Sequence, residues 1–310
     1  MTKIERIDTI LKGDKPDRAP VSLWYHYGSQ FLPGEKYAEI VLAYYKYYDF
    51  DWLKVMNDYF YPVSKDIYEF KSKEDLKLFK PFDIKNSEWN EQLKALKLIN
   101  AELNGKTYFC DTVFDPYQEL QRSPVGEHLP RLMKEEPEAV LEALSVVTDN
   151  VINYAKESLK AGSAGIFLSV LASGDQMSRE DFLKFEKPFA MKVFDAVKDL
   201  GTMNTAHIHG HSIYTEDILD FPVSIMSWED RVSGNPSLSE MKDKFNGCVM
   251  GGLDNTSMTR RTPAYLINNA REGMAMGGDS RFFLANGCSS PGHMDPFSIT
   301  SIVNTAKGNL

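Results

Sequence analysis

Cysteine is scarce in this sequence, with three residues among 310, at Cys110, Cys248 and Cys288. The number is odd and the positions are far apart, so nothing indicates the disulfide framework of a small secreted domain. A chain of this length can bury a large core instead. Hydrophobic residues make up 43% and charged residues 25%, as in an ordinary globular protein. A reducing cytoplasm suits such a composition best.

Long apolar runs are missing as well. No stretch of about 18 apolar residues occurs, which argues against a membrane span. The opening MTKIERIDTILKGDKPDR alternates charged and apolar residues and lacks the apolar block of a secretion signal. We therefore expect a cytoplasmic protein without a membrane partner.

Positive charge is in deficit, since the formal net charge is −9. A nucleic-acid surface needs a basic stripe, so a nucleic-acid partner is not expected. Arginine is absent between Arg18 and Arg122. This gap limits how a highly anionic ligand could be held.

Apolar strands and amphipathic helices alternate along the chain. Strands are expected at 19–26, 52–56, 108–114, 165–170, 203–210, 223–230, 248–254 and 282–290. Strands separated by helices indicate parallel βαβ units. Eight units in about 300 residues predict an α/β protein with a closed (β/α)8 TIM barrel, in a single domain over 1–310. An open doubly wound sheet is the alternative.

The helical signals between these strands are specific. A short N-terminal helix is expected before Gly13, because its isoleucines share one face. A long helix is expected from 137 to Gly162, where the chain can end it. Its buried stripe comprises Val140, Leu144, Val147, Val151 and Ala155. Ser178 with Asp181 predicts a capped helix start, as does Pro296 directly after Asp295. The charged stretch 62–104 is expected to form loops and helix outside the barrel.

Three of the six histidines stand together in AHIHGHSIY. His207 and His209 end one expected strand, and residues two apart on a strand point to the same side. Functional groups of a parallel barrel gather at the carboxyl ends of its strands. Cys288 and Glu229 end two other strands. Zinc accepts nitrogen, sulfur and oxygen ligands, so the sequence predicts a zinc site made by His207, His209, Cys288 and Glu229.

Plainer roles for these residues stay open. A histidine at a strand end commonly bonds a backbone carbonyl, and a lone cysteine such as Cys288 is commonly a small buried residue. Glu229 could be a solvated carboxylate or an ion-pair partner. His211, beyond Gly210, is expected in a loop rather than among the ligands.

Motifs at both ends of the chain carry a family resemblance. The opening ERIDTILKGDKPDRAPV, the internal VMGGLD and the ending GCSSPGHMDPFSITSIVNTAK resemble, in order, the uroporphyrinogen decarboxylase superfamily. The similarity covers essentially the whole chain. It implies a TIM barrel with its active site at the mouth.

One branch of this superfamily decarboxylates a tetrapyrrole, and arginines in its first strand hold the carboxylates. Here the matching stretch SLWYHYGS places Tyr25 and Ser29 at those positions. Neither side chain can replace a bidentate arginine. The aspartate after the second strand is retained as Asp58, and Cys288 stands where that branch has a late histidine. A divergent decarboxylase is therefore the alternative, beside a non-catalytic corrinoid or tetrapyrrole binder.

The other branch comprises corrinoid-linked methyltransferases. Many resemble this chain in carrying His-x-Cys after strand five and Cys after strand eight as zinc ligands. His207 and Cys288 match, and His209 stands in place of the first cysteine. Glu229 resembles the glutamate of cobalamin-independent methionine synthases. The resemblance implies zinc, a corrinoid protein or free cobamide as partner, and a small-molecule methyl donor or acceptor. Imidazole donates less negative charge to zinc than thiolate does, so the identity of the methyl acceptor stays open.

The rest of the expected mouth is aromatic and acidic. Asp58, Tyr25 and His26 are the candidate catalytic residues, with Asp58 preferred as an acid/base or orienting group. Asp111 and Asp115 follow near the third expected strand. Aromatic faces and carboxylates both attract cations, so we expect a flat or cationic guest rather than a polyanion. The function predicted is a zinc-dependent methyltransferase that exchanges a methyl group with a corrinoid.

Overall fold

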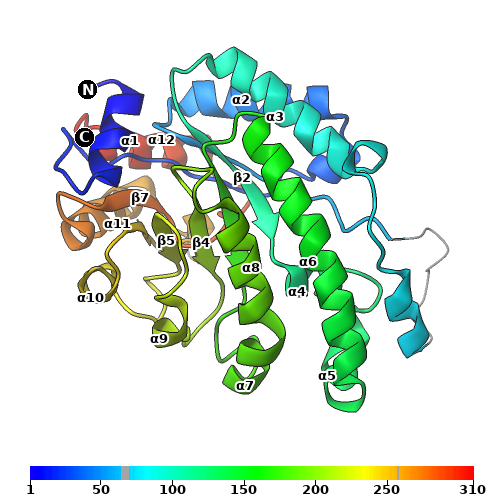
Figure 1. Ribbon diagram of the computed structural model, residues 1–310. Coiled ribbons are helices and arrows are strands. Elements are labelled where there is room, and N and C mark those ends of the chain that lie inside the picture. The colour runs from blue at the N-terminus through cyan, green and yellow to red at the C-terminus, as the bar shows by residue number, and fades with distance from the viewer. Residues whose placement is uncertain (64–69, 71, 257) are drawn as a thin grey trace.

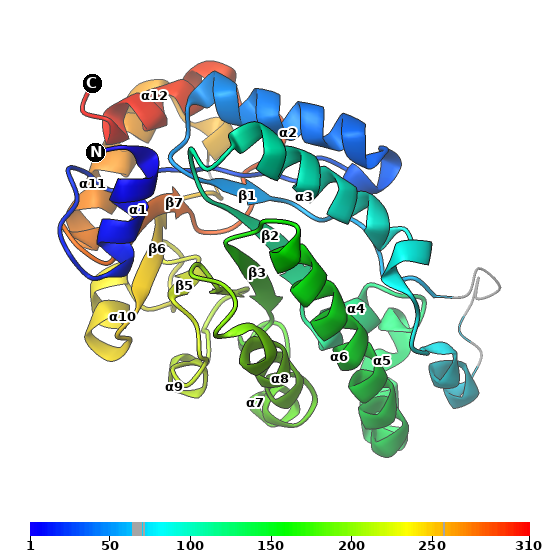
Figure 2. The ribbon, with the colours of Figure 1, turned by 45° about the horizontal axis from the view of Figure 1, so that its top comes forward.

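The backbone is built on seven parallel strands whose order in the sheet is their order along the chain. A computed structural model describes residues 1–63, 70, 72–256 and 258–310. The strands are β1 Leu53–Val55, β2 Phe109–Phe114, β3 Gly165–Val170, β4 Thr205–Ile208, β5 Ile225–Trp228, β6 Cys248–Leu253 and β7 Phe282–Asn286. The sheet curls round on itself with helices outside it, as Figure 2 shows. The fold is the predicted TIM barrel.

The first of the eight expected strands, 19–26, forms only an isolated bridge. Val21 pairs with Leu284 of β7. On its other side the Val21 carbonyl accepts a hydrogen bond from Asp51, just before β1. Pro20 has no N–H to donate. Beyond this point, the Asn286 side chain bonds both the N–H and the carbonyl of Trp24. At Trp24, side-chain hydrogen bonds from Asn286 thus take the place of backbone hydrogen bonds between strands. Residues 20–22 close the gap between β7 and β1 through their backbone hydrogen bonds.

The helices surround the sheet (Figure 1). They are α1 Lys3–Leu11, α2 Gly34–Tyr48, α3 Trp89–Leu103, α4 Pro116–Gln121, α5 Leu129–Glu135, α6 Pro137–Lys160, α7 Arg179–Asp181, α8 Lys187–Val197, α9 Thr215–Ile218, α10 Leu238–Lys244, α11 Pro263–Gly277 and α12 Pro296–Ala306. Short 3-10 turns are η1 Ser29–Phe31, η2 Lys73–Leu78, η3 Ile84–Asn86, η4 Gly126–His128 and η6 Met258–Arg260, and η5 Phe182–Glu186 is π-helical. The two chain ends lie close together beside α1 and α12.

The expected helix features are confirmed where the structure describes them. The predicted stripe of α6 is buried, and Gly162 follows the helix with φ +109°. Ser178 caps α7 by accepting from the Asp181 N–H. Asp295 caps α12 ahead of Pro296. The expected loop-and-helix stretch 62–104 contains η2, η3 and α3, while its residues 64–69 and 71 lie outside the described residues.

Two apolar layers position the site. Alternate strand residues point outward against the helices, and the others fill the barrel together with Trp24, Trp52 and Phe167. Ile7 and Ile10 of α1 belong to the inner layer, and the Cys248 thiol donates to the Ile10 carbonyl at 3.3 Å. Helix α1 therefore plugs the amino end of the barrel, which leaves the carboxyl end for chemistry.

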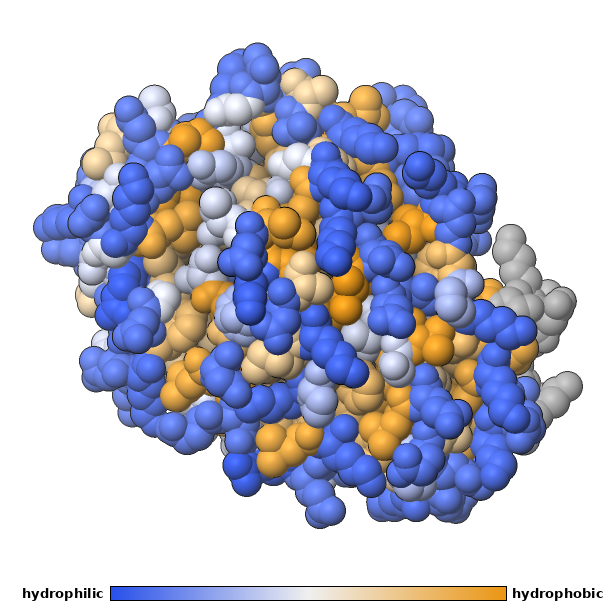
Figure 3. All heavy atoms as spheres, viewed as in Figure 1, coloured by the Kyte–Doolittle hydropathy of each residue, from blue (hydrophilic) through white to orange (hydrophobic). Residues whose placement is uncertain are grey.

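The outer surface is mixed in character. On the face in Figure 3, hydrophilic side chains are spread widely and hydrophobic ones form small groups between them. Among the described helices, none combines the length and the apolar character that crossing a membrane requires.

Candidate functional site at the barrel mouth

A cavity of about 110 Å³ lies within the carboxyl end of the barrel. Side chains from strands β1 to β4 and from the segments after residue 22 and after β7 line it. The lining includes His26, Lys54, Gln118, His207, His209 and Ser289. The cavity therefore collects residues that lie as far apart in sequence as 26 and 289.

His207, His209 and Cys288 form one cluster beside this cavity. Their ligand atoms all lie within 4.8 Å of one another. The Cys288 Sγ is 3.7 Å from the His209 Nδ1, and the two imidazole centroids are 4.5 Å apart. The prediction that a distant sulfur meets two imidazoles from one strand end agrees with this geometry.

Strand β4 carries His207, and His209 follows it directly and donates its backbone N–H to the Val170 carbonyl at the end of β3. His207 pairs in register with Ser169 of β3 and Ser227 of β5. Its Nδ1 lies 3.1 Å from the Ser227 Oγ, which leaves Nε2 for another partner. Burial, followed by the positive charges nearby, lowers the pKa of His207 well below its ordinary value. Burial likewise lowers the pKa of His209 to about 4. Both rings are neutral at pH 7, as metal ligation requires.

Cys288 is held in place by the turn after β7. Gly287 before it packs against the end of β5, where an added Cβ would come within 2.8 Å of the Glu229 Cα. The Asn286 side chain donates to the Cys288 carbonyl. Burial, followed by the negative charge of Glu229, raises the pKa of Cys288 to about 11. The free thiol is thus protonated at pH 7.

Glu229 lies beside the cluster but is not part of it. Its backbone packs against Gly287, and its Oε1 accepts from the Asn255 side chain at 3.2 Å. The cluster within 4.8 Å comprises the other three predicted ligands. The role of Glu229 as a fourth ligand stays a prediction.

The donor set of the cluster fits zinc. With bonds of about 2.0–2.1 Å to nitrogen and 2.3 Å to sulfur, tetrahedral geometry separates a nitrogen from a sulfur ligand by roughly 3.6 Å. The His209 and Cys288 donor atoms are 3.7 Å apart. Zinc held by these three ligands would have one open position, as catalytic rather than structural zinc does.

His26 and Asp58 form a pair at the entrance of the cavity. The His26 Nδ1 is 2.6 Å from the Asp58 Oδ1, and the imidazole is 55% exposed. The other oxygen of Asp58 accepts from the N–H groups of Gly28 and Ser29. Although burial acts to raise it, the pKa of Asp58 is lowered by the bonds from His26 and Ser29. An ionised carboxylate thus orients an imidazole that solvent can reach.

Tyr25 belongs to an aromatic group behind this pair. Its ring centroid is 4.2 Å from that of Tyr27 and 5.3 Å from that of Tyr44 on α2. Burial raises the pKa of its hydroxyl. The structure thus places Tyr25 against other tyrosines, outside the cavity lining that contains its neighbour His26.

Lys54 is a lining residue that the sequence reasoning missed. It occupies the centre of β1 with 4% exposure, and it points inward between Trp52 and Met56. Burial lowers the pKa of Lys54 to about 7. The available signal was the lysine at the centre of the apolar segment WLKVM, because a charge there must face the barrel interior or a partner.

The expected acidic mouth differs from the observed cavity, whose lining contains no aspartate or glutamate among the described residues. Asp111 points outward and accepts from Gln92 of α3 and Tyr154 of α6. Asp115 caps α4 and bonds Gln118. Strand alternation turns Asp111 away from the interior. The described lining thus lacks the carboxylates from which a cationic guest was expected, and the charge of the guest stays untested.

A comparison with known proteins identifies the family. Residues 2–308 match the uroporphyrinogen decarboxylase (URO-D) family. The chain belongs to this family. Its curated relatives include a methylcobamide:CoM methyltransferase from Methanosarcina mazei, 24% identical over 186 residues, and one from Methanosarcina acetivorans, 23% identical. The match covers 59% of this chain and 54% of each relative, so the chain spans about half the length of these relatives.

Solved structures support the fold of this URO-D family member. A methyltransferase from Methanosarcina mazei superposes with a TM-score of 0.79 at 16% identity, over 99% of both chains. A putative vitamin-B12 independent methionine synthase from Listeria monocytogenes superposes with a TM-score of 0.54 at 9% identity, over 90% of this chain and 87% of that one. At these identities the likeness concerns the fold.

One arginine does reach the mouth of this URO-D barrel. Arg122 stacks on Phe114 with 3.6 Å from its guanidinium carbon to the ring centroid, and it donates to the carbonyl of Tyr59 at 3.2 Å. It also lies 3.8 Å from the buried Glu119. These contacts engage Arg122 with the protein itself. The cavity lining includes no arginine among the described residues.

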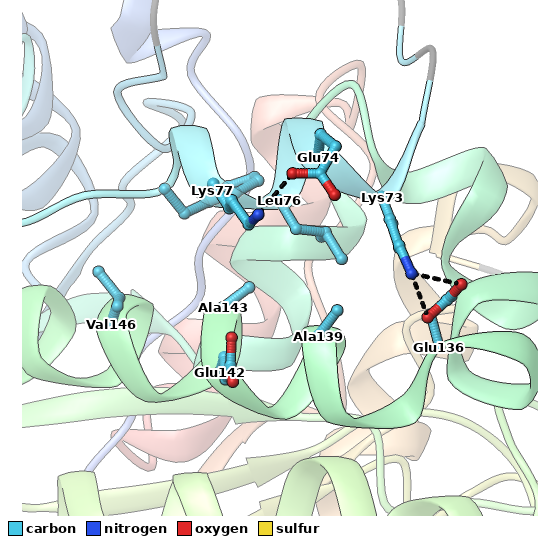
Figure 4. A pocket seen from close by; sticks show the side chains of 10 residues that line it. Lys73, Glu74, Leu76, Lys77, Glu136, Ala139, Glu142, Ala143 and Val146 are labelled. Carbon is cyan, nitrogen blue, oxygen red and sulfur yellow. Dashed lines mark hydrogen bonds and ion pairs between the residues drawn. The ribbon is translucent and has the colours of Figure 1, made fainter.

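A larger groove of about 470 Å³ lies away from this chemistry. Figure 4 shows it on the outer surface, between η2 and α6. Lys73 pairs with Glu136 at one end, and Lys77 pairs with Glu74 at the other. His207 and His209 line the smaller cavity, and Cys288 lies next to them, so the smaller cavity is the candidate site.

Proposed function

We propose that this URO-D family member is a zinc-dependent methyltransferase that exchanges a methyl group between a corrinoid and a small co-substrate. The single observation that carries the proposal is the cluster of two neutral imidazoles and one thiol at the barrel mouth. Methylcobamide-dependent relatives add support. The corrinoid, free or on a partner protein, would dock over the strand ends.

His207, His209 and Cys288 would hold the zinc ion, with Glu229 next to them as a fourth ligand or a rim carboxylate. Zinc bound there would keep a coordinating thiol deprotonated and nucleophilic at neutral pH. Ser227 fixes the orientation of His207 through Nδ1. The inner apolar layer beneath excludes water from the reacting atoms.

His26 and Asp58 would handle the proton at the cavity entrance. Asp58 holds Nδ1 of His26 and thereby leaves Nε2 for another partner. An imidazole placed there can act as a general base toward an incoming co-substrate. Tyr25, packed against Tyr27 and Tyr44, would shape the wall rather than join the reaction.

Tetrapyrrole decarboxylation is the weaker candidate. Its substrate carries many carboxylates, which arginines hold in bidentate pairs. The described lining of the cavity has one lysine and no arginine, and its volume of about 110 Å³ is small for a tetrapyrrole. A non-catalytic corrinoid or tetrapyrrole binder would not need the partly buried His/His/Cys cluster.

Metal analysis and methyl transfer test the proposal together. Protein purified without chelator is expected to contain stoichiometric zinc and to transfer the methyl group of methylcobalamin to a thiol. The change in the corrinoid absorbance measures this transfer. His207→Ala and Cys288→Ala should lose both properties. His211→Ala is the matched control, because this residue is exposed in the adjacent loop. Zinc-free wild-type protein, or metal-independent release of CO₂ from uroporphyrinogen, would reject the proposal.

A further inference from the structure

Lys54 is a buried cation for which the protein supplies almost no hydrogen-bond acceptor. Its ammonium donates to the Met56 sulfur at 2.8 Å. The nitrogen also lies 4.5 Å from the centroid of Phe167 and 5.2 Å from that of Trp24. A thioether is a weak acceptor, and an ammonium has three donors. No carboxylate of the described residues forms an ion pair with Lys54.

Such a position is costly unless another partner arrives. A buried charge needs a counter-charge or hydrogen bonds to offset its lost hydration. The aromatic faces of Trp24 and Phe167 offset part of that cost. A purely structural residue at this inward position would be apolar, as Trp52 and Met56 on either side of β1 are. The lysine therefore fits a ligand-binding role better than a packing role.

The other side chains of the cavity also favour an anionic ligand. Its described lining has no aspartate or glutamate, although the chain carries a formal net charge of −9. The basic side chains of His26, His207 and His209 share the lining with Lys54. His26 is half exposed, whereas Lys54 is buried, so the cavity leads from solvent to the ammonium. A small anion inside the cavity meets no like charge among the described lining residues, and the carboxylate at the entrance, Asp58, is bonded to His26.

We propose that Lys54 binds an anionic group of the small co-substrate and thereby determines which co-substrates the enzyme accepts. The co-substrate would present its reacting atom to His207, His209 and Cys288 and a compact anion, such as a carboxylate, to Lys54. The reaction named here rests on the proposed function, whereas the anion site does not need methyl transfer. Lys54 is thus assigned as a specificity-determining residue.

The anion site is tested by binding alone, on the full chain without any reaction. Propionate and propionamide differ in charge but little in shape. Ligand-observed NMR on the wild-type protein at pH 6 is expected to give at least tenfold tighter binding of propionate. In Lys54→Met the two ligands should bind within about twofold of each other. Lys36→Met, an exposed position on α2, is the control and should retain the wild-type preference.

Two results would overturn the site. If propionate and propionamide bind the wild-type protein equally well, the proposed anion site is disproved, whatever the variants show. A folded Lys54→Met protein that still prefers propionate places the anion elsewhere. Lys54→Gln, which keeps a polar tip, serves as the second variant if the methionine variant does not fold, and it should also lose the preference.

Specificity is tested with three thiols of similar length. The zinc-loaded enzyme receives methylcobalamin and 3-mercaptopropionate, 2-mercaptoethanol or cysteamine, which carry an anion, no charge and a cation. The wild type should favour the anionic thiol by at least tenfold in kcat/KM, and Lys54→Met should lose that factor. If the variant slows all three thiols equally, Lys54 acts on the reacting sulfur and the proposal fails. If no thiol reacts in any protein, the proposed function fails, while the propionate result still decides the anion site.

Discussion

The Cys288 sulfur lies 3.7 Å from the Nδ1 of His209, although 79 residues separate them in the chain. β4 and β7, which deliver them, are not neighbours in the sheet. Their meeting follows from the curvature of the barrel, which brings the carboxyl ends of its strands to one rim. Gly287 then lets the turn after β7 approach the end of β5 closely.

Zinc binding is expected to release one proton per ion at pH 7. The pKa of Cys288 is about 11 and that of His209 about 4, so the free protein holds the proton on sulfur and none on the His209 ring. Ligation needs the thiolate, and zinc affinity should therefore rise about tenfold per pH unit through the neutral range. Calorimetry in buffers of different ionisation enthalpy measures this. A release near zero would remove Cys288 from the ligand set.

Gly287→Ala is expected to weaken zinc binding by at least tenfold. Its Cβ would meet the Glu229 Cα at 2.8 Å, so the turn that carries Cys288 must shift. Gly292→Ala is the control in the same loop, because the nearest atom to its Cβ, on Tyr25, is 3.5 Å away. Competition with a zinc-binding dye measures both affinities. Equal affinities in the two variants would show that the turn position does not set the site.

Asp51→Asn is expected to destabilise the whole barrel by about 3 kcal/mol, as removal of one partner from a buried ion pair does. Asp51 is fully buried and binds both Arg6 and Arg18, while it accepts from the Val21 N–H. It thus joins α1 and the closing segment 20–22 to β1. Urea denaturation gives the change in unfolding free energy.

The control for this prediction is the exposed pair of Lys15 and Asp279. Asp279→Asn should leave the urea midpoint unchanged, because solvent screens such pairs. A similar loss in both variants would mean that Asp51 acts through net charge rather than through its buried bonds.

Asp58→Asn is expected to lower stability at pH 7 by on the order of 1–3 kcal/mol, because the His26 ring and the N–H groups of Gly28 and Ser29 lose a charged partner. The folded pKa of Asp58 is lowered from its ordinary value. Its contribution is therefore present above about pH 4 and is lost as the pH falls through the folded pKa. The gap between wild type and variant should close in acid. Urea titrations at pH 7 and pH 3 measure it, and a gap that stays constant would contradict an ionised Asp58.

The same variant should also change catalysis. Loss of the carboxylate frees His26 to rotate, so kcat should fall at least tenfold while zinc content stays stoichiometric. Ser123→Ala, at a half-buried residue that bonds the Leu120 carbonyl, is a control that should leave kcat unaltered. Unchanged kcat in Asp58→Asn would assign the His26–Asp58 pair a purely structural role.

Strand and helix positions could be read from local patterns. The alternation of apolar strands and helices predicts β1 to β7 with ends that differ by a few residues, and the stripe from Val140 to Ala155 predicts the buried face of α6. Residues 20–22 could not be assigned correctly in this way. Whether an extended segment forms a strand depends on its neighbours, and here Asn286 bonds Trp24 through its side chain.

The sequence by itself determined the barrel, because hydrophobic periodicity is a local property that can be read directly from the order of the residues. It also predicted that His207, His209 and Cys288 lie together, because strand ends in a parallel barrel share one rim, while their role as metal ligands stays a prediction. Only the tertiary structure decided the charge of the cavity. Strand alternation and barrel curvature turn Lys54 inward and Asp111 outward, and these directions depend on which face of each strand the closed sheet encloses.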